Sequence, residues 1–211
     1  MIYTRVDFYQ DTCNTTKSTY IDRMAESGTE YVYQWIHAFP PALFIDVEGE
    51  YEIIKADDID SSFKGNFYNL FDCQAARFTV KNMASSLISG TDSCIAVLGS
   101  TKTGGVYYPV EFHKSLGLGA CWGAAYKSWY NTEGFDDDSW YLGMIMMGDP
   151  VIRMYNASAS DLAAGSRSLS NMIPISDEEK DEIYLQLRDF SPPSGLAADL
   201  LEDLQQSGND H

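Results

Sequence analysis

The 211-residue chain has little positive charge. It carries 14 Lys and Arg residues against 31 Asp and Glu residues, which gives a formal net charge of −17 at pH 7. Nucleic acids and anionic membrane surfaces are bound through positive patches, so the composition excludes both as main partners. The sequence also lacks any apolar run near the roughly 20 residues that a membrane helix needs. We therefore expect a domain that does not span a membrane.

Motifs for metals and cofactors are also missing. The four cysteines include no CxxC pair, so a zinc site is not supported, and no GxxxxGK[ST] phosphate-binding motif occurs. The acidic run at residues 136–138 does not have the spacing of an EF-hand loop, and a solvated acidic loop explains it better than calcium binding. The sequence predicts neither a metal nor a cofactor.

Apolar segments alternate with helix-like segments over most of the chain, and this indicates an α/β fold. The pattern favours a mostly parallel sheet with helices on both faces, and a β-hairpin at residues 42–54 interrupts the alternation. We expect strands at residues 6–10, 31–37, 67–72, 94–101 and 151–155, and helices at 19–27, from after Cys73 to Gly90, at 110–118 and at 119–130. Residues 1–155 form the predicted domain, 156–175 a linker and 176–211 an acidic helical tail.

Two chemically capable residues follow aromatic, apolar strands. His37 ends the strand predicted at residues 31–37, and Cys73 ends the one predicted at 67–72. Open α/β sheets place their sites at the carboxyl ends of strands. A cysteine beside a histidine is a nucleophile beside a base, and a helix starting after Cys73 would favour its thiolate. We therefore predict a Cys73/His37 dyad for nucleophilic attack on an acyl carbon.

Simpler interpretations exist for these residue types. Cys73 alone is read as a small buried hydrophobe, and His37 alone as a donor to a loop carbonyl. The other candidates fit packing roles better, since Cys94 opens a buried strand, Cys121 lies in a helix, and His113 lies in a helix beside a lysine. Only the pairing of His37 with Cys73 on successive sheet strands favours catalysis.

Four stretches in order resemble the gingipain-type cysteine peptidases of the caspase-like group. They are residues 33–40 around the histidine, 70–78 around the cysteine, 95–101 for the next strand, and the Gly-Asp-Pro turn at 148–153. The resemblance covers about residues 6–155. It implies a caspase-like fold and a cysteine-type endopeptidase that acts through a thioester acyl-enzyme on a protein or peptide substrate, in an extracellular or cell-surface location.

The resemblance also assigns roles to individual residues. It implies Cys73 as the nucleophile and His37 as the general acid and base. The backbone N–H groups of Ala38 and Cys73 would form the oxyanion hole, and Tyr107 and Tyr108 would line the substrate pocket. The family usually has glycine where this chain has Ala38.

The family's opening strands, and the acidic residue that orients its histidine, would lie upstream of Met1. We therefore expect this chain to be a C-terminal portion of a catalytic domain, whose missing N-terminal part would be a partner. Two alternatives stay open. One is a catalytically inactive caspase-like module for binding or scaffolding, and the other is an α/β domain in which Cys73 and His37 only pack.

Overall fold

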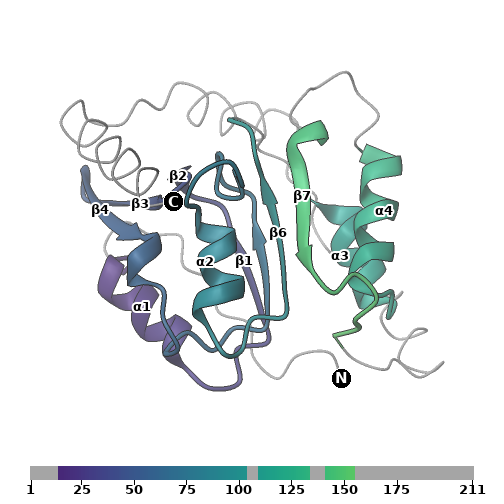
Figure 1. Cartoon of the computed structure of the whole chain (residues 1–211), viewed down its shortest axis with the longest axis horizontal. Coiled ribbons are helices and arrows are strands. Elements are labelled where there is room, and N and C mark those ends of the chain that lie inside the picture. The colour runs from purple at the N-terminus through teal and green to yellow at the C-terminus, as the bar shows by residue number, and fades with distance from the viewer. Residues whose placement is uncertain (1–13, 104–108, 134–140, 155–211) are drawn as a thin grey trace.

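The computed structural model describes residues 14–103, 109–133 and 141–154 (Figure 1). The elements in chain order are α1 (Lys17–Ala25), β1 (Tyr31–Gln34), β2 (His37–Phe39), β3 (Ala42–Val47), β4 (Glu50–Lys55), the 3-10 turn η1 (Ala56–Asp58), β5 (Phe67–Leu70), α2 (Met83–Gly90), β6 (Ala96–Ser100), α3 (Val110–Gly117), α4 (Trp122–Glu133), the 3-10 turn η2 (Tyr141–Gly143) and β7 (Met144–Gly148). No helix within these described ranges is both long and apolar enough to cross a membrane.

A four-stranded sheet with the order β1-β5-β6-β7 forms the centre of the molecule. The β1/β5 and β5/β6 pairs are parallel and the β6/β7 pair is antiparallel. All residues of β5 and β6 are buried, as expected for strands covered on both faces. The predicted α/β fold with a mostly parallel sheet is therefore confirmed.

Two hydrophobic clusters lie on opposite faces of this sheet. Tyr68 and Leu70 of β5 pack with α1 and α2, whereas Phe67 packs with the aromatic side chains of α3 and α4. Successive strand residues point to opposite faces, so this division follows from the strand period. Figure 1 shows α2 crossing one face of the sheet, while α3 and α4 lie together to the right of β7 in this view.

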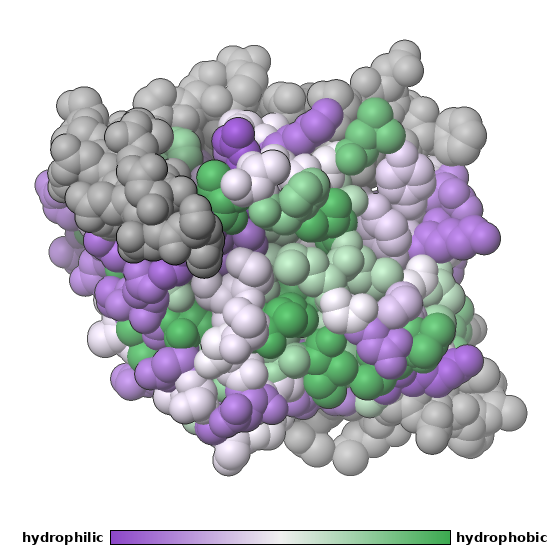
Figure 2. Space-filling model, in the orientation of Figure 1, coloured by the Kyte–Doolittle hydropathy of each residue, from purple (hydrophilic) through white to green (hydrophobic). Residues whose placement is uncertain are grey.

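The face seen in Figure 1 carries hydrophobic side chains near its middle, whereas hydrophilic residues gather toward its sides (Figure 2). Two residues of β7, Ile145 and Met147, pack against the cluster of this face but remain partly exposed. The strand β7 is an edge strand of the sheet. The described helices therefore bury this face more completely over β5 and β6 than over β7.

A second, smaller sheet has the order β2-β3-β4 and is antiparallel throughout. Glu48 and Gly49 form its tight turn with φ values of 54° and 92°. Two consecutive left-handed residues suit a two-residue hairpin because their twist matches that of the strands. The hairpin predicted at residues 42–54 is confirmed, and it places an antiparallel unit between β1 and β5.

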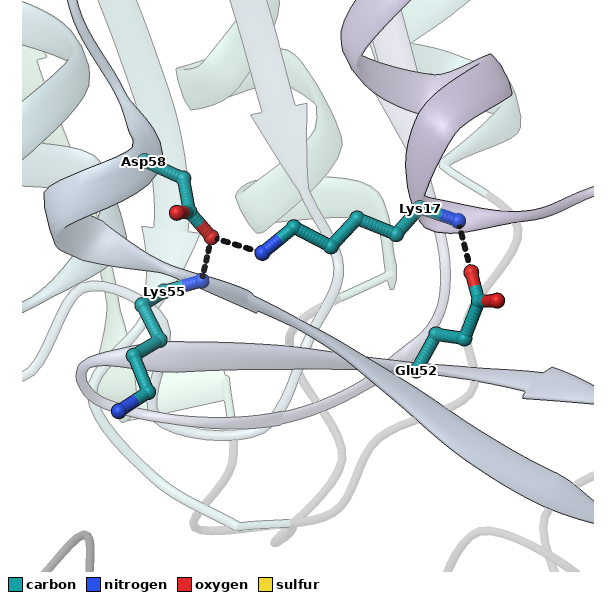
Figure 3. Close-up of polar contacts among 4 residues, drawn as sticks. All are labelled: Lys17, Glu52, Lys55 and Asp58. Atoms are coloured by element: carbon teal, nitrogen blue, oxygen red, sulfur yellow. Dashed lines mark hydrogen bonds and ion pairs between the residues drawn. The ribbon is translucent and has the colours of Figure 1, made fainter.

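The start of α1 is fixed to the end of this hairpin (Figure 3). The Thr16 side chain caps the helix, and the backbone N–H of Lys17 donates to the Glu52 carboxylate at 2.5 Å. The Lys17 ammonium pairs with Asp58 at 2.6 Å, and the same Asp58 oxygen accepts the Lys55 N–H at 2.8 Å. A cap and an anchored first turn together define where α1 lies on the sheet.

Two predicted element boundaries next to the candidate residues are wrong. The strand β1 ends at Gln34, so His37 does not end it but opens β2 in the smaller sheet. The helix predicted directly after Cys73 begins only at Met83, where Asn82 caps it. Phe78, within the predicted helix, instead lies in the turns before α2 and is 67% exposed.

The strand predicted at residues 151–155 is absent from residues 151–154. The chain instead forms β7 before the Gly-Asp-Pro turn, antiparallel to β6. Asp149 accepts the Val151 N–H at 2.9 Å, and this local turn leaves Val151 exposed. The predicted strand at 6–10, Tyr155, the linker at 156–175 and the acidic tail at 176–211 lie outside the described residues.

Candidate active site

The carboxyl ends of β1 and β5 lie side by side. The two strands are parallel and pair Gln34 with Leu70 at their last residues. The pairing continues one step further, since the Phe71 N–H donates to the Gln34 carbonyl at 3.2 Å. The chain therefore leaves both strands at the same edge of the sheet, where open α/β folds place their sites.

A buried carboxylate joins the two departing segments. Asp72 is 1% exposed and directly precedes Cys73. One of its oxygens accepts the backbone N–H of Ile36 at 2.7 Å, and the other accepts the Gln34 amide at 2.6 Å. Ile36 directly precedes His37. The residues before the two predicted dyad members are therefore hydrogen-bonded to each other.

The hydrogen bonds of Asp72 extend to α1. Tyr20 of α1 donates its hydroxyl to the side-chain amide oxygen (Oε1) of Gln34 at 2.8 Å, so the Gln34 side chain links Tyr20 to Asp72. Burial raises the pKa of Asp72 to about 7, against the lowering effect of its hydrogen bonds to Gln34 and Ile36. Burial also raises the pKa of Tyr20, with smaller contributions from Tyr68 and Asp72.

Cys73 is partly exposed and opens a tight turn that ends at Ala76. Its neighbour Gln74 has φ 56°, which non-glycine residues rarely adopt. The Gln74 N–H donates to the Lys102 carbonyl at 3.0 Å, and the Ala76 N–H donates to the Ser100 carbonyl at 2.9 Å. The cysteine turn is thus fixed to the end of β6, and its left-handed residue is held by the surrounding structure.

Glycine at position 99 permits this close approach. A Cβ atom there would lie 2.9 Å from the Cβ of Ala76 and 3.5 Å from that of Leu70. Small residues on both sides let the turn after Cys73 pack directly on β6. The expected contribution of a helix N-terminus to Cys73 does not hold, because α2 begins at Met83 and a helix dipole acts only near its first turn.

His37 lies in β2, on the face of the small sheet that carries Phe44 and Tyr51. Its ring meets that of Tyr51 edge-on, with centroids 6.4 Å apart and an interplanar angle of 83°. Burial lowers the pKa of His37 to about 4, and the charge of Asp46 opposes this shift. The imidazole is therefore neutral at pH 7, the form that accepts a proton.

Asp46 is a further candidate residue near His37, and the sequence did not predict it. It lies on β3 two residues after Phe44, which is directly opposite His37 on β2. Residues i and i+2 of a strand share a face, so the alternation places Asp46 beside the histidine. The only sequence signal was an acidic residue at the end of the apolar run at 42–47.

Ala38 is buried, and its side chain belongs to the cluster under the small sheet with Leu43. It therefore points to the opposite face of β2 from His37. The proposed role of its N–H as an oxyanion donor stays a prediction, as does that of the Cys73 N–H. The predicted pocket residues Tyr107 and Tyr108 lie outside the described residues.

The remaining candidates are partly or fully buried. His113 accepts or donates a hydrogen bond with the Tyr31 hydroxyl at 2.7 Å, and burial lowers its pKa to about 4. Cys94 and Cys121 are partly buried, and burial raises the pKa of Cys94 to about 12. A thiol with so high a pKa is a poor nucleophile at neutral pH. These positions fit the packing role predicted for them.

The fold is α/β, with a mostly parallel sheet between two helical layers, and it matches the caspase-like fold of a solved neighbour. Among solved structures, the chain resembles the crystal structure of the Arg-specific cysteine proteinase gingipain R (RGPB), with a TM-score of 0.50 and 15% sequence identity. The similarity covers 65% of this chain and 36% of that chain, so the present chain corresponds to about a third of its neighbour. No protein-family model matches the chain. No curated protein matches it either.

Proposed function

We propose that the protein is a cysteine-type endopeptidase in which Cys73 attacks the carbonyl carbon of a peptide bond. His37 takes the thiol proton and passes it to the leaving amine as the C–N bond breaks and the C–S bond of a thioester forms. Water then attacks the thioester. The C–O bond forms, the C–S bond breaks and the proton returns through His37 to the thiolate.

The hydrogen bond from the Ile36 N–H to Asp72 is the observation that carries this proposal. It connects the residues that immediately precede His37 and Cys73, at the carboxyl edge of neighbouring parallel strands. The similarity in fold to a cysteine proteinase supports the same reaction class. Nucleophilic catalysis requires a nucleophile and a base within reach of each other, and the joined segments support such a placement of Cys73 and His37.

Burial keeps the His37 ring neutral at pH 7, which is the form that can accept the thiol proton. The charge of Asp46 opposes the lowering of the His37 pKa and favours the imidazolium that forms when the proton is taken up. The Ala38 methyl group points into the core, so it does not crowd a substrate on the His37 face. We propose that the N–H groups of Ala38 and Cys73 stabilise the oxyanion. We also propose an extracellular or cell-surface location and a protein or peptide substrate.

Cysteine substitutions test the proposal. Cleavage of a mixed peptide library, followed by mass spectrometry, is expected for the wild type and for Cys94→Ala, and it should disappear in Cys73→Ala. Cys94 is a matched control because it is also a partly buried thiol, but with a pKa of about 12. Equal cleavage by Cys73→Ala and the wild type would exclude Cys73 as the nucleophile.

A second candidate function is an inactive caspase-like binding module. The observation in its favour is Ala38 itself, which stands where the gingipain-type peptidases usually have glycine after the histidine. This interpretation predicts no cleavage by the wild type. An Ala38→Gly variant would then separate a site whose oxyanion N–H is misplaced by this residue, in which cleavage appears, from a module without catalysis.

A further inference from the structure

We infer that Asp72 is the positioning residue of the proposed dyad, holding the segment before His37 at a fixed place beside Cys73. The inference rests on the proposed function and extends it to a residue outside the dyad. Asp72 lies next to the nucleophile in sequence and is buried. Its two carboxylate oxygens bind two different groups of the β1 segment, the Ile36 backbone and the Gln34 side chain.

The β1 segment needs such a restraint because it changes sheets at this point. The strand β1 ends at Gln34, and β2 begins at His37 in the other sheet. Trp35 and Ile36 belong to neither strand. The Asp72 carboxylate binds this two-residue connection directly, through the Ile36 N–H. The position at which His37 enters β2 therefore depends on Asp72.

Further hydrogen bonds fix the groups around this carboxylate. Gln34 donates to it and accepts the Tyr20 hydroxyl of α1. The Phe71 N–H, one residue before Asp72, donates to the Gln34 carbonyl. On the other side, the turn after Cys73 is fixed to β6 through the Gln74 N–H. A buried, connected polar network of this kind restricts its members to one arrangement.

The network works through acceptor atoms and does not require a full negative charge. Asparagine at position 72 keeps one oxygen for the Ile36 N–H, and its amide can donate to the Gln34 oxygen once the Gln34 amide turns over. The Tyr20 hydroxyl then accepts in place of donating. Leucine offers no acceptor and leaves two buried donors unpaired. The two substitutions therefore separate a positioning role from a charge-based role.

The experiment compares Asp72→Asn, Asp72→Leu and the control Asp22→Asn, which changes an exposed carboxylate on α1. Peptide-cleavage kcat and KM are measured against pH, together with the rate at which iodoacetamide alkylates Cys73. Positioning predicts that Asp72→Asn stays within about threefold of the wild type with the same pH profile. Asp72→Leu should lose about 100-fold or more in kcat, because a shift of about 1 Å costs that much.

The Cys73 alkylation profile of Asp72→Leu should also match that of His37→Ala. Loss of activity in a folded Asp72→Asn variant would overturn the inference, because the charge would then be what matters. Full activity in Asp72→Leu would overturn it as well. If Asp72→Leu does not fold, hydrogen exchange of the Ile36 N–H in the wild type is measured instead. The inference predicts slow exchange at this amide, and rapid exchange would contradict it.

Measurements on the wild-type protein show whether the proposed function itself fails. A chain that cleaves no peptide, and whose Cys73 alkylation is unchanged in His37→Ala, has no dyad. That result would overturn both the function and the positioning role. Failure of the positioning role alone is confined to the Asp72 variants and leaves the wild-type activity intact.

Discussion

At the scale of single residues, His113 has its ring packed among aromatic side chains. It meets Tyr31 and Tyr33 edge-on at 5.7 and 5.2 Å between centroids, and Phe112 is its neighbour in α3. Burial lowers its pKa from the usual 6.5 to about 4. In the unfolded chain the same histidine takes up a proton near pH 6.5, so the unfolded state binds more protons between these two values.

Stability should therefore fall as the pH falls from 6.5 to 4. The His113 contribution is complete above pH 6.5 and is lost as the pH approaches 4, by up to about 3 kcal/mol in free energy of unfolding. We expect His113→Phe to remove this contribution and to leave that of His37, whose pKa burial also lowers to about 4. Urea denaturation across that pH range measures the change. Tyr31→Phe is the control, because it removes the same hydrogen bond but leaves the titrating ring.

The control Tyr31→Phe should lower the free energy of unfolding by a similar amount at every pH.

Asp72 affects the pH dependence in the opposite direction. Its pKa is raised to about 7, so its destabilising effect develops as the pH rises from 3.8 to 7. The comparison is therefore made between each variant and the wild type at the same pH. An unchanged pH dependence in His113→Phe would show that this histidine is already protonated in the folded state near pH 6.5.

At the scale of elements, the β6/β7 pairing depends on Gly148. This residue ends β7 opposite Ala96 and has φ 102°. A Cβ atom there would lie 2.8 Å from the Ala96 Cα and even closer to the Ile95 carbonyl oxygen. Both contacts are with backbone, which cannot move aside as a flexible side chain can.

Gly148→Ala should therefore destabilise the protein by more than the cost of a left-handed alanine, which is about 1–2 kcal/mol. Gly49→Ala is the matched control, because Gly49 has φ 92° and no heavy atom within 4 Å of the added Cβ. Urea denaturation of both variants measures the difference. Equal losses in the two variants would mean that the β6/β7 contact is looser than described.

Elements with a clear local pattern were predictable. The helix predicted at residues 110–118 is α3, and the hairpin predicted at residues 42–54 is formed by β3 and β4. The segment after Cys73 was not predictable, because Gln-Ala-Ala-Arg is a good helical sequence. Its turn is imposed by contacts with Lys102 and Ser100, which are distant in sequence. Tertiary contacts here outweigh helix propensity.

At the scale of the whole molecule, the strand order determines which residues meet. The sequence predicted the sheet and the two candidate segments, because strand periodicity and chain order are local information. It did not predict Asp72 or Asp46 as site residues. Their partners are defined by the β1/β5 pairing and by the β2/β3 register, which are known only once the chain is folded.

The most direct test of the account is the rate at which iodoacetamide alkylates Cys73 as a function of pH, resolved by peptide mapping. A functional dyad predicts that Cys73 reacts well below the usual thiol pKa of about 8.5, and that His37→Ala removes this reactivity. Cys94 and Cys121 serve as internal controls in the same sample. A Cys73 that reacts no faster than these two, with or without His37, would contradict the central claim.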